Sequence, residues 1–195
     1  MMKVIYGITI IMQVQNRLAF VEDGMDGTMG ADAAHVGVQQ RLYLDDLRVG
    51  QRFASRSHRI DEAELTGFAG VYDPQPFHLD DAAARETLFG GLAASGWHTA
   101  AVTMRLNVES GLPFAGGLIG AGAELSWPRP TRPGDVLRVV SEIREVAPSR
   151  SRPDRGMVTV KSLTLNQRDE VVQILVAKLV VPRAPGAHTP RMGAL

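Results

Sequence analysis

The sequence predicts an α+β domain in which an antiparallel sheet curls around one long helix. Three observations lead to this prediction. The run from Trp97 to Val108 is apolar on nearly every side of a helix, the pattern of a buried helix. Four segments rich in β-branched and apolar residues follow it. Clusters of proline, glycine and charged residues separate these segments and indicate turns between antiparallel strands.

The composition is that of one ordinary globular domain. The 195 residues suffice for a hydrophobic core, and 45% are apolar, as in soluble proteins. Because 21 basic residues balance 21 acidic ones, charge gives no reason to expect nucleic acid or an anionic membrane as a partner. There is no cysteine, which excludes disulfides and thiolate chemistry and is typical of a reducing compartment. We therefore expect a cytoplasmic protein.

Residues 1–41 predict a flexible N-terminal extension rather than a signal peptide. Their apolar run, Val4 to Met12, is about nine residues long, whereas a membrane-spanning helix needs about 20. No small-x-small cleavage site follows it directly. The alternative is that translation begins later, near Met25 or Met29.

The folded domain is expected over residues 42–183, followed by a proline-containing tail over 184–195. Residues 52–60 read as its first strand. Asp61 then offers a helix N-cap, and Glu64 lies three residues further on, so the two predict a capping box at the start of a short helix.

Two more helix starts follow in the chain. Asp80 or Asp81 can cap a brief helix that runs through Arg85. Ser95 is the predicted N-cap of the long helix, which at about 1.5 Å per residue is roughly 20 Å long. This length matches the width of a small sheet.

The predicted strands after the long helix form an antiparallel meander. They are Leu118–Trp127, Asp135–Val146, Gly156–Asn166 and Glu170–Val181. One sheet wrapped around a single helix is a hotdog arrangement. Because such a sheet leaves an edge and an apolar flank exposed, we expect a homodimer or a higher homo-oligomer.

The segment YDPQPFHLDD, residues 72–81, is the first candidate site. Pro76 excludes an undisturbed helix between Asp73 and His78, so we expect a stiffened loop that can turn both side chains toward one cavity. A carboxylate and an imidazole held this way can act as base and acid on one substrate. The alternative is an ordinary turn in which His78 only forms a structural hydrogen bond.

The start of the long helix is the second candidate site. Ser95, Gly96 and Trp97 lie where helix amides lack intrahelical partners and can bind a developing oxyanion. Gly96 would let a substrate approach the backbone closely, although close packing of the glycine against the sheet explains it equally well. Together, the two sites provide what proton transfer next to a carbonyl group requires.

Residues 68–100, FAGVYDPQPFHLDDAAARETLFGGLAASGWHTA, resemble the signature region of the MaoC-like (R)-specific enoyl-CoA hydratases. That family has a short helix, then D-x-N-P-[apolar]-H-x-D, then a glycine at the start of the hotdog helix. Residues 127–139, WPRPTRPGDVLRV, are similar to the family's proline-rich connection ending in a Gly-Asp turn. The resemblance covers roughly residues 42–183.

The resemblance implies addition of water to a trans-2-enoyl-CoA, or its removal from the (R)-3-hydroxyacyl thioester, within fatty acid metabolism. Asp73 and His78 would activate water and move the proton, and the Gly96 amide would hold the thioester oxygen. No cofactor or metal is implied. The chain departs from the family pattern at two positions: Gln75 replaces the usual asparagine, and Met104 stands where some relatives have serine.

Several alternatives stay open at this point. Other hotdog proteins are acyl-CoA thioesterases or non-catalytic acyl-thioester-binding modules. A metal site formed by His78, Asp80 and His98 has weak spacing and is not predicted. Trp97 and Met104 are expected to pack in the core. Three arginines are either ligands for the phosphates of coenzyme A or solvated surface residues: Arg105, Arg129 and Arg132.

Overall fold

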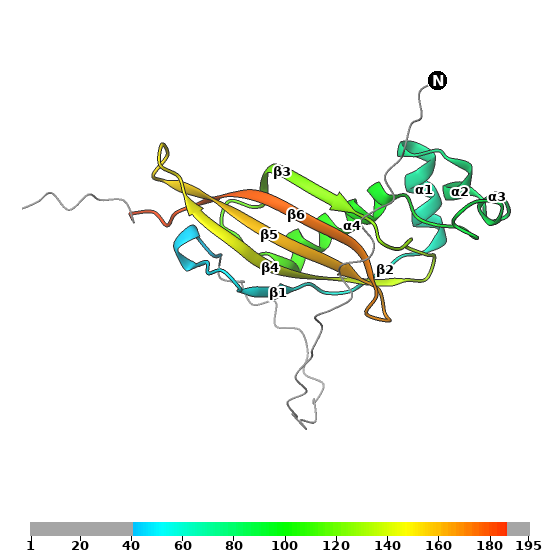
Figure 1. The fold of residues 1–195 in the computed structure, drawn as a ribbon, viewed down its shortest axis with the longest axis horizontal. Helices are drawn as coiled ribbons and strands as arrows, with labels where there is room; N and C mark the ends of the chain where they lie inside the picture. Colours follow the sequence, from blue (N-terminus) through cyan, green and yellow to red (C-terminus); the bar gives the residue numbers. More distant parts are fainter. Residues whose placement is uncertain (1–40, 187–195) are drawn as a thin grey trace, which may run out of the picture. The chain divides into compact units, whose positions relative to one another are not determined.

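The computed structural model describes residues 41–186 (Figure 1). The predicted N-terminal extension up to residue 40 and the tail from residue 187 lie outside the described residues. Within residues 41–186, no helix has the length and apolar character needed to cross a membrane.

The described chain contains one antiparallel sheet of six strands (Figure 1). Its strands are β1 (Arg52–Ala54), β2 (His58–Arg59), β3 (Ile119–Ser126), β4 (Val136–Pro148), β5 (Arg155–Leu165) and β6 (Val171–Pro182). The order across the sheet is β1-β4-β5-β6-β3, and β2 also pairs with β4. The four predicted long strands are thus present, each with ends within about two residues of the prediction.

The pairing of β3 differs from the predicted meander, because β3 pairs with β6 and not with β4. The nine residues 127–135 join the two strands and include three prolines. They can span roughly 30 Å when extended, whereas the three inter-strand spacings between β3 and β4 amount to about 14 Å. A proline-rich segment of this length therefore crosses the end of the sheet instead of closing a hairpin.

The helices are α1 (Glu62–Tyr72), α2 (Pro76–Leu79), α3 (Asp81–Arg85) and α4 (Gly96–Leu106), with a 3₁₀ turn η1 (Leu44–Asp46) and a π turn η2 (Asn107–Gly111). All three predicted N-cap positions are confirmed. The carboxylates of Asp61 and Asp80 accept hydrogen bonds from the Glu64 and Ala83 amides, each at 2.7 Å, and Ser95 caps α4. These caps satisfy amides that a helix start leaves unpaired.

The predicted strand over residues 52–60 forms as two short pieces, β1 and β2, both paired with β4. The weak alternation of apolar residues in this segment gives it few side chains to bury continuously against the sheet. The Ser55 hydroxyl, between the two pieces, accepts a hydrogen bond from the Val139 amide at 2.9 Å. The chain between β1 and β2 therefore stays hydrogen-bonded to β4.

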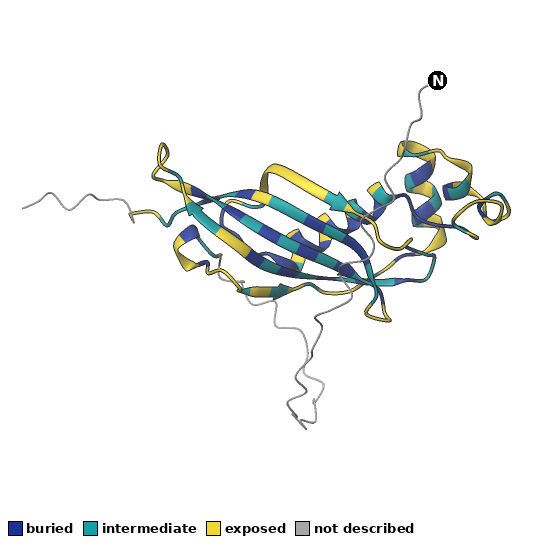
Figure 2. Ribbon diagram, viewed as in Figure 1, coloured by how far each residue is buried: buried dark blue, intermediate teal, exposed yellow. Residues whose placement is uncertain are grey.

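The core has two parts, one between α4 and the sheet and one where Leu44 of η1 and Phe114 pack on β4, β5 and β6, and burial alternates along the central strands (Figure 2). On α4, Val102 and Leu106 pack with Leu137 and Val139 of β4 and with Val172 of β6. Only this side of α4 is covered, so the prediction of a helix buried all round is wrong for the single chain. Trp97, Met104 and Val108 are exposed on the opposite side.

Candidate active site

The segment between α1 and α2 places Asp73 at the end of a helix. Asp73 is the C-cap of α1, with φ −151° and ψ 67°, and its amide donates to the Ala69 carbonyl at 2.9 Å. Pro74 prevents α1 from continuing. The predicted stiffened loop is wrong in one respect, because Pro76 begins the one-turn helix α2. Proline is accommodated there because the first helical amide needs no intrahelical partner.

Three side chains surround the Asp73 carboxylate. The Ser95 hydroxyl donates to Oδ2 at 2.6 Å, and the Gln75 amide donates to Oδ1 at 2.7 Å. Hydrogen bonding by Ser95 is the largest cause that lowers the pKa of Asp73; Gln75 and the nearby His78 act in the same direction, against partial burial. Asp73 is therefore a carboxylate at neutral pH. Gln75, which replaces the asparagine of the family pattern, takes part directly in holding it.

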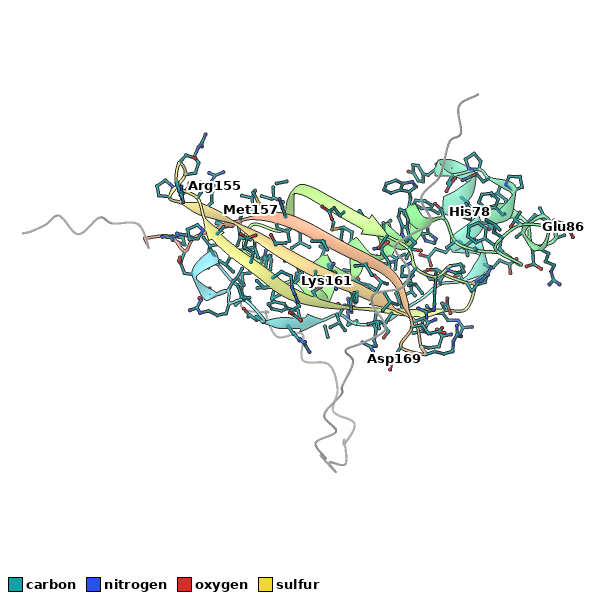
Figure 3. The ribbon with its side chains drawn as sticks, in the orientation of Figure 1. His78, Glu86, Arg155, Met157, Lys161 and Asp169 are labelled. Carbon is teal, nitrogen blue, oxygen red and sulfur yellow. The ribbon has the colours of Figure 1, made fainter. Side chains whose placement is uncertain are left out.

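The His78 ring is buried beside Asp73, among the helices at one end of the sheet (Figure 3). Its Nδ1 lies 2.7 Å from the Ala93 carbonyl oxygen, which can only accept, so Nδ1 carries a proton. This leaves Nε2 as the atom that gains or loses a proton. It lies 3.4 Å from Asp73 Oδ2, and the two side chains therefore face one point.

The start of α4 meets this pair through Ser95. The Ser95 oxygen accepts from the Trp97 amide at 3.2 Å while its hydroxyl donates to Asp73. Within residues 41–186, the Gly96 amide forms no hydrogen bond, whereas the Trp97 amide is occupied by the cap. Of the two, only the Gly96 amide can bind a substrate oxygen. The Trp97 side chain is exposed and does not pack in the core as predicted.

Arg132 and Arg105 have different partners in the structure, and Met104 does not lie where it was predicted. Arg132 donates from Nη1 to the Gly91 and Leu92 carbonyls, at 2.6 and 3.0 Å, and from Nη2 to the Phe89 carbonyl. Its guanidinium fixes the segment before α4 and is not a free phosphate ligand. Arg105 Nε pairs with Glu109 at 2.9 Å on the surface of α4. Met104 lies half-exposed on the same helix and not in the core.

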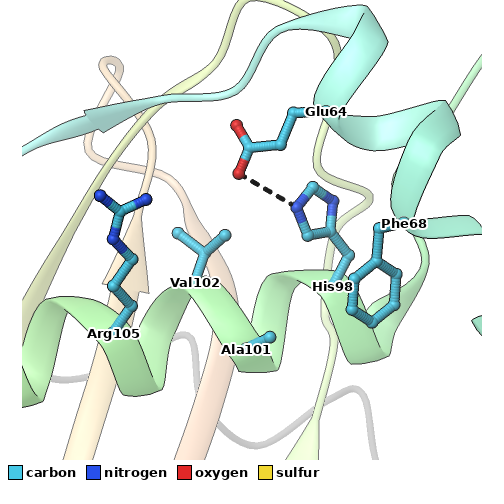
Figure 4. Close-up of a pocket in the computed structure, with 6 residues that line it drawn as sticks. All are labelled: Glu64, Phe68, His98, Ala101, Val102 and Arg105. Carbon is cyan, nitrogen blue, oxygen red and sulfur yellow. Dashed lines mark hydrogen bonds and ion pairs between the residues drawn. The ribbon is translucent and has the colours of Figure 1, made fainter.

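A second acid–imidazole cluster lies further along α1 and α4 (Figure 4). Glu64 Oε1 lies 3.3 Å from His98 Nε2, and His58 Nε2 lies 2.9 Å from Glu64 Oε2. The predicted capping box is therefore incomplete, because Glu64 meets two histidines and does not return to the Asp61 amide. The cluster borders a pocket of about 250 Å³ with Phe68, Ala101, Val102 and Arg105. His78 and His98 face different carboxylates, so they do not converge on one metal.

Trp127 also lies at the site and was not identified from the sequence as a functional residue. Its ring packs on Gly96 so closely that a Cβ added there would lie 2.8 Å from Trp127 Cε2. The close-packing explanation for this glycine is thus supported, with an aromatic ring as the neighbour. The glycine itself was the only sequence signal, because Trp127 lies about 30 residues away and reaches Gly96 through the fold.

A known protein family matches most of the described chain. The family model described as "MaoC like domain" matches residues 47–166, inside the predicted domain. The chain belongs to this family. A crystal structure described as a MaoC-like dehydratase from Rhodospirillum rubrum is 64% identical to this MaoC-like chain, with a TM-score of 0.73. The alignment covers 74% of this chain and 99% of the other.

Two further relatives connect the family to water addition and removal. The 3-hydroxybutyryl-CoA dehydratase of Methylorubrum extorquens is 31% identical over 156 residues, which is 78% of this chain and 93% of the relative. The structure of the (R)-hydratase PhaJ1 from Pseudomonas aeruginosa is 28% identical, with a TM-score of 0.59, and covers 79% of this chain and 97% of that one. The predicted hotdog fold is confirmed by these neighbours.

Proposed function

We propose that the protein interconverts a trans-2-enoyl-CoA and the corresponding (R)-3-hydroxyacyl-CoA, with Asp73 and His78 as its acid–base pair. The observation that supports this most is the 3.4 Å separation of Asp73 Oδ2 and His78 Nε2 next to the start of α4. Membership of the MaoC-like family and the names of the dehydratase and hydratase relatives support the same reaction class.

In the hydration direction, Asp73 accepts a proton from water as the water oxygen bonds to C3 of the enoyl group. The lowered pKa of Asp73 keeps it ionised and ready to accept. The protonated Nε2 of His78 delivers its proton to C2. The proton on Asp73 then passes to His78 Nε2, and the pair returns to its starting state. Dehydration follows the same steps in reverse.

The Gly96 amide is the proposed partner of the thioester oxygen. Negative charge develops on that oxygen as the hydroxyl adds to C3, and an amide at a helix start stabilises it. Ser95 links the two halves of the site, because it caps α4 and also holds Asp73. The carboxylate is thereby fixed relative to the amide that binds the oxygen.

We further propose that the active form is a homodimer. The outer side of β3 has no partner strand among the described residues, and nearly all residues of β3 are exposed. Ile119 on β3 and the exposed face of α4 add apolar surface. A second copy of the chain would cover both. Size-exclusion chromatography with light scattering would detect twice the chain mass, and a monomer at all concentrations would refute this proposal.

The reaction is tested with crotonyl-CoA in one assay that follows two signals. Loss of the enoyl absorbance reports hydration, and a thiol reagent reports release of free coenzyme A. We expect the absorbance to fall to an equilibrium value without thiol release. Thiol release would identify a thioesterase, and saturable binding of crotonyl-CoA without turnover would identify a non-catalytic binding module.

A further inference from the structure

Both tryptophans of the chain lie at the start of α4. Trp97 is the second residue of the helix, and the Trp127 ring packs edge-on against it, with centroids 5.7 Å apart and planes at 74°. Both side chains are substantially exposed, 62% for Trp97 and 40% for Trp127. In the single chain, this pair therefore forms an apolar surface next to the Gly96 amide.

Trp127 is held in place by a completely buried side chain. The indole Nε1–H donates to Gln173 Oε1 at 2.8 Å, and Gln173 lies on β6 beneath α4. Gln173 Nε2 in turn donates to Thr103 Oγ1 at 3.0 Å. Thr103 donates to the Thr99 carbonyl at 2.8 Å, so its oxygen is free to accept. The orientation of the Gln173 amide is therefore fixed at both ends.

The hydrogen-bond network connects α4, β5 and β6 to the Trp127 ring. Thr103 also lies 2.6 Å from Thr164 Oγ1 on β5, which must be the donor because the Thr103 proton is already used. Buried polar groups are costly in a core unless every one is paired, and these are paired. Apolar side chains at these positions would not fix the orientation of the indole. The hydrogen-bond network fixes it, and in that orientation the ring packs directly on Gly96.

We propose that Trp127, positioned by Gln173, forms one wall of the slot that receives the thioester next to the Gly96 amide. This inference rests on the proposed function and assigns these residues a role in it. The indole N–H is used by Gln173, so the ring acts through its faces and edge. An apolar wall there excludes water from the amide and strengthens the hydrogen bond to the substrate oxygen. Trp127 is thus a substrate-contacting residue and Gln173 a positioning residue.

The first test is a binding titration of the full chain with butyryl-CoA, which cannot be hydrated at C2–C3. Because Trp97 and Trp127 are the only tryptophans, the tryptophan fluorescence of the chain comes from this pair alone. The Trp97→Phe variant leaves Trp127 as the single reporter. We expect a saturable change in its emission. Saturable binding of butyryl-CoA by calorimetry, with no change in Trp127 emission, would overturn the inference, including the case in which a second copy of the chain covers the indoles.

The second test is a double-mutant cycle on crotonyl-CoA hydration. Trp127→Phe keeps a ring but loses the N–H, and Gln173→Met keeps the volume but loses the acceptor. We expect each to lower kcat about tenfold with a smaller change in KM, the size of effect that misplacement of a site group produces. The double variant should lose little more than either single variant, because both remove the same contact.

The matched control is Ser162→Ala. It removes another buried hydrogen bond of the same sheet, the 2.7 Å contact between Ser141 and Ser162, which has no connection to Trp127. It should lower the melting temperature and leave kcat unchanged. Equal kcat losses in the control and in Gln173→Met, or fully additive losses in the cycle, would refute positioning. If Gln173→Met does not fold, unchanged kcat in Trp127→Phe refutes it alone. Absence of turnover in the unmodified protein would instead refute the proposed function, and the titration would still test the wall.

Discussion

Helix α1 supplies a carboxylate at each end, and each faces a buried imidazole at almost the same distance. Asp73 Oδ2 lies 3.4 Å from His78 Nε2, and Glu64 Oε1 lies 3.3 Å from His98 Nε2. Distance alone would make both pairs equal candidates for acid–base chemistry. Their surroundings separate them.

In the Asp73–His78 pair, a hydrogen bond to a third group fixes each side chain, whereas no such bond from residues 41–186 fixes His98 of the Glu64 pair. His78 Nδ1 donates to a carbonyl, whereas His98 Nδ1 is buried with no hydrogen-bond partner among the described residues. Burial is the largest cause that lowers the pKa of His98, so this ring is neutral at neutral pH. Asp73 is also bonded to the cap of α4, next to the Gly96 amide, for which residues 41–186 provide no hydrogen-bond partner. An acid–imidazole contact becomes a candidate site when both groups are anchored beside such an amide.

The largest expected difference between the pairs is in turnover. Asp73→Asn and His78→Ala should each lower the rate of crotonyl-CoA hydration at least about 100-fold, the contribution of a positioned acid or base. Glu64→Gln is the matched control, and its rate should stay within about threefold of the unmodified protein because it supplies no such group. Steady-state absorbance measurements decide this. Equal losses in Glu64→Gln and Asp73→Asn would remove the distinction between the pairs.

Ser95→Ala should have the next largest effect, because it removes the main cause of the lowered pKa of Asp73. We expect about a tenfold lower rate from poorer positioning. In the proposed mechanism Asp73 acts in its ionised form, so activity should be lost as the pH falls through its pKa. Raising that pKa moves the acidic limb of the pH–rate profile to higher pH.

Asp61→Ala is the control for the Ser95 prediction. It removes the N-cap of α1, as Ser95→Ala removes the cap of α4, and a cap contributes about 1 kcal/mol. Both variants should lose stability to a similar degree, but only Ser95→Ala should change the pH–rate profile. An unchanged acidic limb in Ser95→Ala would contradict the role of Ser95 in ionising Asp73.

His98→Phe should change stability more than turnover. The pKa of His98 in the folded protein lies below its ordinary value of 6.5, so in that interval the unfolded chain binds a proton that the folded protein does not. Its contribution to stability is complete above pH 6.5 and is lost as the pH falls below it. Denaturant unfolding at several pH values should therefore give a flatter profile for the variant. Parallel profiles would contradict the burial of a neutral ring beside Glu64 and Phe68.

The smallest effect is expected at Gly67, which lies on α1 between the two carboxylates. A Cβ there meets nothing within 4 Å, so Gly67→Ala should stabilise the protein by about 0.5–1 kcal/mol through helix propensity, with unchanged turnover. Gly96→Ala is the opposite case, because its Cβ would meet the Trp127 ring. Thermal unfolding and hydration rates of both variants test this. A stabilised, fully active Gly96→Ala protein would contradict the close packing at the site.

Local signals explain what could be predicted from the sequence. Caps and strands depend on neighbouring residues, so Asp61, Ser95 and the limits of the long strands were identified correctly. The pairing of β3, the exposed face of α4 and the position of Trp127 depend on contacts between distant segments. A local sequence pattern does not indicate which distant segments will be in contact.

Two local signals were interpreted wrongly for instructive reasons. Pro76 was expected to lie in a stiffened loop between Asp73 and His78, yet proline is suited to the first position of a helix and begins α2. Glu64 was expected to complete a capping box, but two histidines from β2 and α4 compete for its carboxylate. Gln75 was a departure from the family pattern, and its longer side chain still reaches Asp73. In each case the residue type was suitable, and tertiary neighbours selected its role.

The stereochemical course of hydration tests the central claim most directly. Asp73 Oδ2 and His78 Nε2 lie 3.4 Å apart, and in the proposed mechanism this pair delivers oxygen and proton to the same face of the double bond. Crotonyl-CoA hydrated in D₂O should therefore carry deuterium at C2 and the new hydroxyl at C3 in the syn relationship, as read from proton coupling constants, and chiral chromatography of the released acid should give the R configuration at C3. An anti product would contradict the account.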